Sequence, residues 1–220
     1  MTINLYPLNS YMLTCQKCNS FTSQQENIEK KIPKKKIYIS KKDDNLFWIF
    51  YYLLYGNIIK ETVNEFNIKN EFKIQSIIKH QNDPSILKPY RVVRKNEGVQ
   101  NLQENVTNVY GLHALCLLHD INIIYVVKHL YYEIMCANGP IHVIQDGNLI
   151  ENVNKETLQE IKISHVLVTD FEKPLKGIAN YKKDELIDMA KNLKLNIHTD
   201  RIIKKGIYDL IYDLIKIEKI

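Results

Sequence analysis

The stretch Asp43-Asp-Asn-Leu-Phe-Trp-Ile-Phe-Tyr-Tyr-Leu-Leu-Tyr-Gly56 decides the fold of this chain of 220 residues. Residues 46–55 would be apolar on nearly every side of a helix, and a helix of that kind is buried. Asp43, Asp44 and Asn45 are residue types that cap the start of a helix, and a glycine often follows its end. We therefore predict a helix over Leu46–Tyr55 at the centre of the core. The run is too short to span a bilayer.

The residues on either side of this helix predict a mixture of helices and strands. Apolar residues recur at helical spacing between residues 57 and 80, namely Ile58, Ile59, Val63, Phe66, Phe72, Ile74, Ile77 and Ile78. Residues 106–119 predict a second core helix. Short apolar or alternating runs predict strands at 36–40, 122–127, 130–135, 141–144 and 161–168. Asp146-Gly147-Asn148 predicts a hairpin turn. The fold class is α+β, with a mixed core around a buried helix and a C-terminal helix-loop-helix.

Changes in composition divide the chain into three parts. Residues 1–36 form an N-terminal segment and a basic linker, since seven lysines and no acidic residue stand between residues 30 and 42. Such a block is usually a solvated arm, and sometimes contacts nucleic acid or an anionic membrane. Residues 37–172 hold the α+β core domain, and residues 173–220 hold the terminal helices.

Composition also excludes several classes of protein. Hydrophobic residues make up 45% of the chain, which is enough for a real core and argues against global disorder. Four cysteines are too few for a dense disulfide framework and favour an intracellular, reducing location. Because no run of apolar residues is long enough to cross a bilayer, we expect no membrane insertion. Only seven glycines leave little room for a phosphate-binding loop, and we expect no cofactor.

The last forty residues carry two helical stripes. Leu186, Ala190 and Leu193 lie on one stripe, and the other consists of Ile207, Leu210, Ile211 and Leu214. Neither stripe is stable alone, so we expect the two helices to pack as a hairpin or to dock on the core. Basic residues stay on the outer surface. The candidate nucleic-acid-binding residues are Lys182, Lys183, Lys191, Lys194, Arg201, Lys204 and Lys205.

Residues 181–215 resemble a SAP-type helix–extended loop–helix, a small module that binds DNA in its family. The likeness rests on Asp184-Glu185-Leu186, Ala190, Leu193, the Leu195–Ile197 link, Lys204-Lys205, and Leu210, Ile211 and Leu214. The family usually has a glycine in the connection, where Asn196 stands here. The resemblance implies DNA contact through these helices. The alternative is a plain amphipathic pair whose lysines are merely solvated.

The core resembles an ovarian-tumour-type (OTU) or papain-like cysteine peptidase in degenerate form. The family pattern Asp-Gly-Asn-Cys-Leu-Phe precedes a buried helix, and here Asp43-Asp-Asn-Leu-Phe precedes one. Leu112-His-Ala-Leu-Cys-Leu-Leu-His-Asp-Ile-Asn-Ile-Ile-Tyr-Val is similar to a later helix-to-strand step. Leu46 stands where the family has its nucleophile, so no acyl-enzyme can form there. Cys116 and Cys136 would have to replace it, with His142 or His165 as the base. We name no catalytic residue.

Metal binding has little support in the sequence. Cys15 and Cys18 have the spacing of half a zinc site, but no second pair of ligands with matching spacing follows. The prediction is therefore that the protein holds no metal.

Three segments resemble uncharacterised proteins of nucleocytoplasmic large DNA viruses: Lys42-Asp43-Asp44-Asn45-Leu46-Phe47-Trp48; Asn122-Ile-Ile-Tyr with Tyr131-Tyr132-Glu133; and Lys173-Pro-Leu-Lys-Gly-Ile with Tyr181-Lys182. That likeness implies a component of the virion or of the virus factory in the host cell. The leading hypothesis is a non-enzymatic structural or adaptor protein that binds DNA weakly, without sequence preference, through the terminal helices. Its partners would be DNA and other virion or capsid proteins. The alternatives are a divergent cysteine hydrolase and a minor capsid protein that contacts only proteins.

Overall fold

The structure is a computed structural model that describes residues 36–37, 43–56, 64–88, 95–136, 138–197 and 203–216. The chain divides into two compact units, Met1–Pro33 and Lys34–Ile220, and every described residue belongs to the second. The basic block at 30–42 lies outside the described residues, apart from Lys36 and Ile37. The apolar positions Ile58, Ile59 and Val63 lie outside them too. The division into three parts stays a prediction.

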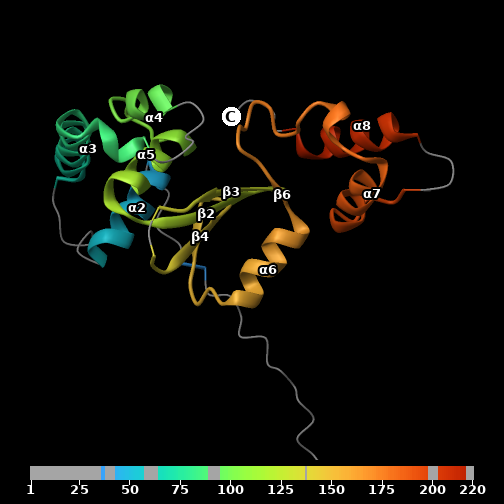
Figure 1. Ribbon diagram of the computed structural model, residues 1–220. Coiled ribbons are helices and arrows are strands. Elements are labelled where there is room, and N and C mark those ends of the chain that lie inside the picture. The colour runs from blue at the N-terminus through green and yellow to red at the C-terminus, as the bar shows by residue number, and fades with distance from the viewer. Residues whose placement is uncertain are drawn as a thin grey trace, which may run out of the picture. The chain divides into compact units, whose positions relative to one another are not determined.

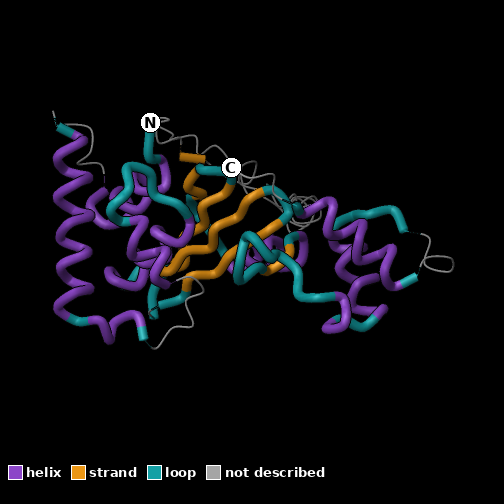
Figure 2. The backbone as a smooth tube through the Cα atoms, turned by 90° about the horizontal axis from the view of Figure 1, so that it is seen from above, coloured by secondary structure: helices purple, strands orange, loops and turns teal. Residues whose placement is uncertain are grey.

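The predicted mixture of helices and strands is confirmed (Figure 1). Six strands form one mixed sheet in the order β1-β5-β4-β2-β3-β6, and Figure 2 shows them side by side. They are β1 (Lys36–Ile37), β2 (Asn122–Val127), β3 (Leu130–Ile134), β4 (Ile141–Gln145), β5 (Asn148–Ile150) and β6 (Val166–Leu167). The central pair, β2 and β4, is parallel, and β2 also pairs with β3 in antiparallel register. The two edge strands are only two residues long, which limits the unpaired backbone at each edge.

The turn between β4 and β5 has the predicted hairpin geometry. Asp146 and Gly147 both have positive φ angles, 48° and 73°, and Gln145 pairs with Asn148 on either side of them. Two residues with positive φ make the type I′ turn, whose twist matches that of the flanking strands. Asp-Gly is a preferred sequence for that turn, so the local chemistry sets the register of β4 against β5.

Helices cover both faces of the sheet. Alternate residues of β2 face opposite ways: Ile123 joins the cluster that contains α2 (Asn45–Tyr55) and α5 (Val109–His119), while Ile124 joins the smaller cluster with Ile161 of α6 (Lys155–Ser164). Figure 1 shows α6 and the α2–α5 pair on opposite sides of the strands. The predicted central helix is confirmed in α2, where Phe47, Trp48, Ile49 and Phe50 are buried. Helix α5 is more deeply enclosed, since every residue from Tyr110 to Leu118 is buried.

The predicted helical periodicity is confirmed in the next helix, but most of the apolar residues named there lie outside its buried face. Helix α3 (Glu65–Asn82) forms, but Phe66, Ile74 and Ile78 are 62%, 55% and 47% exposed. The face that turns inward carries Lys69, Phe72, Lys73 and Ser76, which also recur at helical spacing. The buried carboxylate of Asp44, the residue before α2, lies within 4 Å of both lysines, and this contact between distant residues favours the observed rotation of the helix. After α3 follow η3 (Pro84–Leu87) and α4 (Lys95–Asn101).

Two further boundaries differ from the prediction. Helix α5 begins at Val109 and not at Val106, because the Asn108 side chain accepts hydrogen bonds from the N–H groups of Tyr110 and Gly111 and so caps the helix. The first half of the strand predicted at 161–168 is the end of a helix. Asn154 accepts from the N–H of Thr157 at 2.7 Å and starts α6, and only the short β6 remains of the strand.

The terminal residues form η4 (Ile178–Asn180), α7 (Lys183–Asn192) and α8 (Lys204–Ile215). The two α-helices contact each other and bury Leu186 and Ala190 on α7 and Ile207 and Ile211 on α8. Ile215 completes the buried stripe of α8, whereas Leu210 is 43% exposed, so its predicted burial is wrong. From here on, α7 and α8 are called the terminal pair.

Candidate functional site

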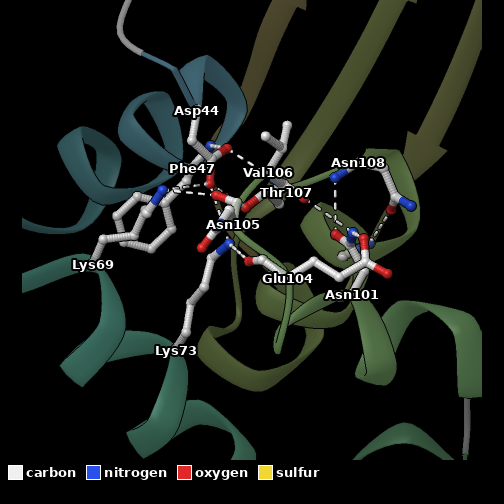
Figure 3. Close-up of polar contacts among 11 residues, drawn as sticks. Asp44, Phe47, Lys69, Lys73, Asn101, Glu104, Asn105, Val106, Thr107 and Asn108 are labelled. Carbon is white, nitrogen blue, oxygen red and sulfur yellow. Dashed lines mark hydrogen bonds and ion pairs between the residues drawn. The ribbon is translucent and has the colours of Figure 1, made fainter. Parts of the chain in front are cut away.

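A buried carboxylate organises the start of α2. The side chain of Asp44 is fully buried and accepts from the backbone N–H of Phe47, which makes it the N-cap of the helix. It also accepts from the backbone N–H of Thr107 at 3.0 Å and from the Thr107 hydroxyl at 2.9 Å. Asp44 therefore ties the central helix to the loop that precedes α5 (Figure 3).

Two lysines of α3 reach toward this carboxylate, as Figure 3 shows. The Lys73 ammonium lies 3.1 Å from Asp44 Oδ2, and the Lys69 ammonium lies 3.7 Å from the same atom. Each lysine also donates to a backbone carbonyl, Lys73 to Glu104 at 2.9 Å and Lys69 to Asn105 at 2.7 Å. Burial lowers the pKa of Lys73, and the charge of Asp44 acts against that shift. A carbonyl oxygen accepts from each buried ammonium besides the ion pair with Asp44, which offsets part of the cost of burying the charge.

This cluster connects the start of α2 with α3 and with the loop before α5. Both carboxylate oxygens of Asp44 accept hydrogen bonds within the protein, and Lys73 donates to two partners. A cavity of about 240 Å³ adjoins the cluster, lined by Asp43, Asp44, Trp48, Glu65, Phe66 and Lys69. Sequence reasoning missed the cluster because nothing in the spacing of Lys69 and Lys73 distinguishes them from solvated lysines.

Neither of the two described cysteines, Cys116 and Cys136, is activated as a nucleophile. Cys116 is fully buried on α5, as expected from its place among apolar residues, and burial raises its pKa. Burial also raises the pKa of Cys136 to about 11, and its thiol donates to the carbonyl of Ile121 at 2.8 Å. A nucleophilic cysteine needs the opposite shift, because the thiolate is the reactive form.

The candidate bases lie in different elements of the core. His142 is on β4, and His165 follows α6, where its Nδ1 lies 2.9 Å from the Ser164 hydroxyl and 3.2 Å from the carbonyl of Ile161. Burial lowers the pKa of both histidines. Near Leu46, where the peptidase family has its cysteine, Asn45 donates to the carbonyl of Gly147 in the β4–β5 turn. That turn has the sequence Asp146-Gly147-Asn148 and carries no histidine.

Among the described residues, no three histidine, cysteine or acidic side chains gather closely enough to hold a metal ion. Cys15 and Cys18 lie outside those residues, so the structure does not describe the half-site that they form in the sequence. Within the same ranges, every helix is too short or too polar to cross a bilayer.

The candidate nucleic-acid-binding lysines gather mainly around the start of each helix of the terminal pair. Lys182 stands at the N-cap position of α7 and Lys183 is its first residue, while Lys204 and Lys205 are the first two residues of α8. The ring centroids of Tyr181 and Tyr208 are 6.3 Å apart, which brings the residue before the N-cap of α7 close to the second turn of α8. Lys182, Lys183 and Lys205 are exposed, and Lys204 is half-buried.

The remaining candidates lie elsewhere. Lys191 and Lys194 are exposed at the other end of α7, where Lys191 is 3.8 Å from Asp188. Lys194 has a φ of 58° and ends the helix, with the N–H of Leu195 bonded to the carbonyl of Ala190. A left-handed residue at this position satisfies the last carbonyls of a helix. Arg201 lies outside the described residues.

Comparison of the chain with known protein families, with curated proteins and with solved structures finds no match.

Proposed function

We propose that this chain is a non-enzymatic binding protein that holds DNA through the lysines at the starts of α7 and α8. The observation that carries the proposal is the contact between Tyr181, which directly precedes the N-cap of α7, and Tyr208 in the second turn of α8. Four lysines lie within four residues of one or the other tyrosine along the chain: Lys182, Lys183, Lys204 and Lys205.

Electrostatics makes this arrangement costly unless an anion is present. The first turn of a helix carries the positive end of the helix dipole, so acidic residues stabilise it and lysines oppose it. Helix α7 offsets the effect with Asp184 and Glu185, and Glu185 accepts from the backbone N–H of Lys182 at 2.8 Å. Helix α8 has no acidic residue in its first turn and begins with two lysines. A phosphate group would supply the missing negative charge. It would also accept hydrogen bonds from the backbone N–H groups at the start of the helix.

Contacts of this kind position a protein on the phosphate backbone and carry no sequence information. We therefore infer weak binding without sequence preference. The proposal extends to the resemblances in the sequence: a degenerate OTU-like core, in which Leu46 replaces the nucleophile, and a SAP-like terminal pair. Weak binding without sequence preference would suit a structural or adaptor protein of a DNA virus. Such a protein would lie in the virion or the virus factory and bind other virion or capsid proteins.

The test measures the affinity of the full chain for labelled duplex DNA over a range of salt concentrations. The variant changes Lys182, Lys183, Lys204 and Lys205 to glutamine. The fold should survive, because these changes remove repulsion between lysines and helix dipoles. The slope of log affinity against log salt should become shallower by about 3 to 4 units, since each phosphate contact on duplex DNA contributes about 0.9.

A matched control removes the same charge from exposed lysines of the core: Lys88, Lys128, Lys155 and Lys162. It should leave the slope nearly unchanged. An equal loss in the two variants would show that net charge alone drives binding. If the unmodified chain binds no DNA even at low salt, the protein-only minor capsid alternative replaces this proposal.

A further inference from the structure

Three tyrosines of the terminal pair form a row. The ring centroids of Tyr181 and Tyr208 are 6.3 Å apart with ring planes at 49°, and those of Tyr208 and Tyr212 are 6.3 Å apart with planes at 13°. All three side chains are half-exposed. These three residues are therefore more exposed than Tyr110 of α5 and Tyr132 of β3, which are buried.

Backbone groups of Lys176 hold two of these rings in place. The Tyr181 hydroxyl accepts from the N–H of Lys176 at 3.1 Å, and the Tyr208 hydroxyl donates to its carbonyl at 3.0 Å. Rings fixed in this way lose little further freedom when a ligand binds, which lowers the entropic cost of binding.

Lysines continue the row along α8. Lys205, Tyr208, Tyr212 and Lys216 follow one another at intervals of three or four residues, so they lie along one side of the helix. Ile207, Ile211 and Ile215 turn to the buried side. Asp209 and Asp213 come one position after the tyrosines and border the row, so a phosphate chain would avoid them and follow the lysines. Lys182 and Lys183 follow Tyr181 in the chain and so lie at the Tyr181 end of the row.

This combination of fixed rings and lysines distinguishes a single strand from a duplex. In a duplex the base faces are stacked inside and only the phosphates reach a protein surface, whereas a single strand can lay its bases on aromatic rings. A surface meant only for duplex phosphates would need the lysines but not the tyrosines between them.

We propose that Tyr181, Tyr208 and Tyr212 are a stacking surface for the bases of single-stranded nucleic acid, with the lysines of the row holding its phosphates. The inference rests on the proposed function, because Lys182, Lys183 and Lys205 serve both. The inference goes beyond the proposed function because it says which form of nucleic acid, single-stranded, the terminal pair prefers. Binding of this kind tolerates many sequences, since every base has a face that can stack.

The experiment compares the full chain and its variants on three labelled probes: an unstructured single strand of about 16 thymidines, the uridine equivalent in RNA, and a blunt duplex. Tyr212→Leu removes one ring while keeping an apolar side chain, and Tyr212→Phe keeps the ring and removes the hydroxyl. Tyr55→Leu changes a tyrosine that is exposed on α2, outside the row, and serves as control. Circular dichroism of each variant confirms that α8 is still folded.

We expect the single strands to bind more tightly than the duplex. Tyr212→Leu should weaken single-strand binding at least fivefold, the lower end of what one stacked base contributes, and should leave duplex binding unchanged. Tyr212→Phe and Tyr55→Leu should bind as the unmodified chain does. The DNA and RNA arms identify which sugar the site takes.

Two outcomes overturn the inference while the proposed function stands. In the first, single strands and duplex bind equally well. In the second, Tyr212→Leu leaves the single-strand affinity unchanged although the four-lysine variant loses it. Absence of binding to all three probes would instead reject the proposed function itself. If Tyr212→Leu proves unfolded, Tyr181→Leu, which lies outside α8, replaces it under the same criteria.

Discussion

Neutralising Asp44 should destabilise the protein severely. Asp44→Asn preserves the shape of the side chain but removes its charge, and it replaces one accepting oxygen with an NH₂ group. That group would face donors, because Lys73 and the Thr107 hydroxyl both donate to Oδ2 of the carboxylate. The Lys73 ammonium, whose side chain is only 4% exposed, would be left buried without its counter-charge.

The expected loss follows from that uncompensated charge. Breaking a buried ion pair by removing one partner costs about 3–5 kcal/mol of the free energy of unfolding. With a urea dependence of about 2 kcal/mol per molar, the midpoint of unfolding should fall by roughly 1.5–2.5 M. The single tryptophan, Trp48, lines the cavity beside the cluster and reports the transition by fluorescence. Far-UV circular dichroism gives an independent readout.

Asp43→Asn is the matched control, because Asp43 is the preceding residue and is exposed. A surface change of this kind should cost no more than about 0.5 kcal/mol. The double variant Asp44→Asn with Lys73→Met removes both charges, so it should be more stable than the sum of the single effects implies. If Asp44→Asn lowers stability no more than Asp43→Asn does, the carboxylate does not hold α3 in place and the reasoning fails.

Three other changes test separate features of the fold. Trp48→Ala should cost about 3–5 kcal/mol in urea unfolding followed by circular dichroism, because the ring is only 4% exposed in the core. His113 is buried against the Tyr132 hydroxyl, and burial lowers its pKa to about 4, so the neutral form is favoured in the folded state. The free energy of unfolding should therefore fall as the pH drops from about 6.5 to 4. The fall should be roughly 3 kcal/mol larger in the unmodified chain than in His113→Gln. Parallel profiles of stability against pH for the two proteins would contradict this. Lys194→Gly should raise the melting temperature, with a gain of up to about 1 kcal/mol, since Lys194 has a φ of 58° that glycine adopts without strain; a lower melting temperature would refute it.

Local sequence determined the elements whose cause is also local. The continuous apolar run after Asp44 and Asn45 forms a helix, and its residues Phe47–Phe50 are buried, because hardly any side of it is polar. Asp146-Gly147 makes a type I′ turn because its two residues accept positive φ angles. The exposed lysines of the terminal pair also lie where the helical stripes put them, since the opposite sides of α7 and α8 are apolar.

Only the tertiary structure decided which side of α3 turns inward. Two stripes compete on that helix, an apolar one with Phe66, Ile74 and Ile78 and a mixed one with Lys69 and Lys73. Asp44, which is 29 positions from Lys73 along the chain, selects the mixed stripe through a charge–charge contact that helical periodicity does not contain. The row of tyrosines arises in the same way, because Tyr181 meets Tyr208 only when the two terminal helices pack. Spacing along a chain fixes which residues share a side of one helix, whereas a partner on another element determines what that side contacts.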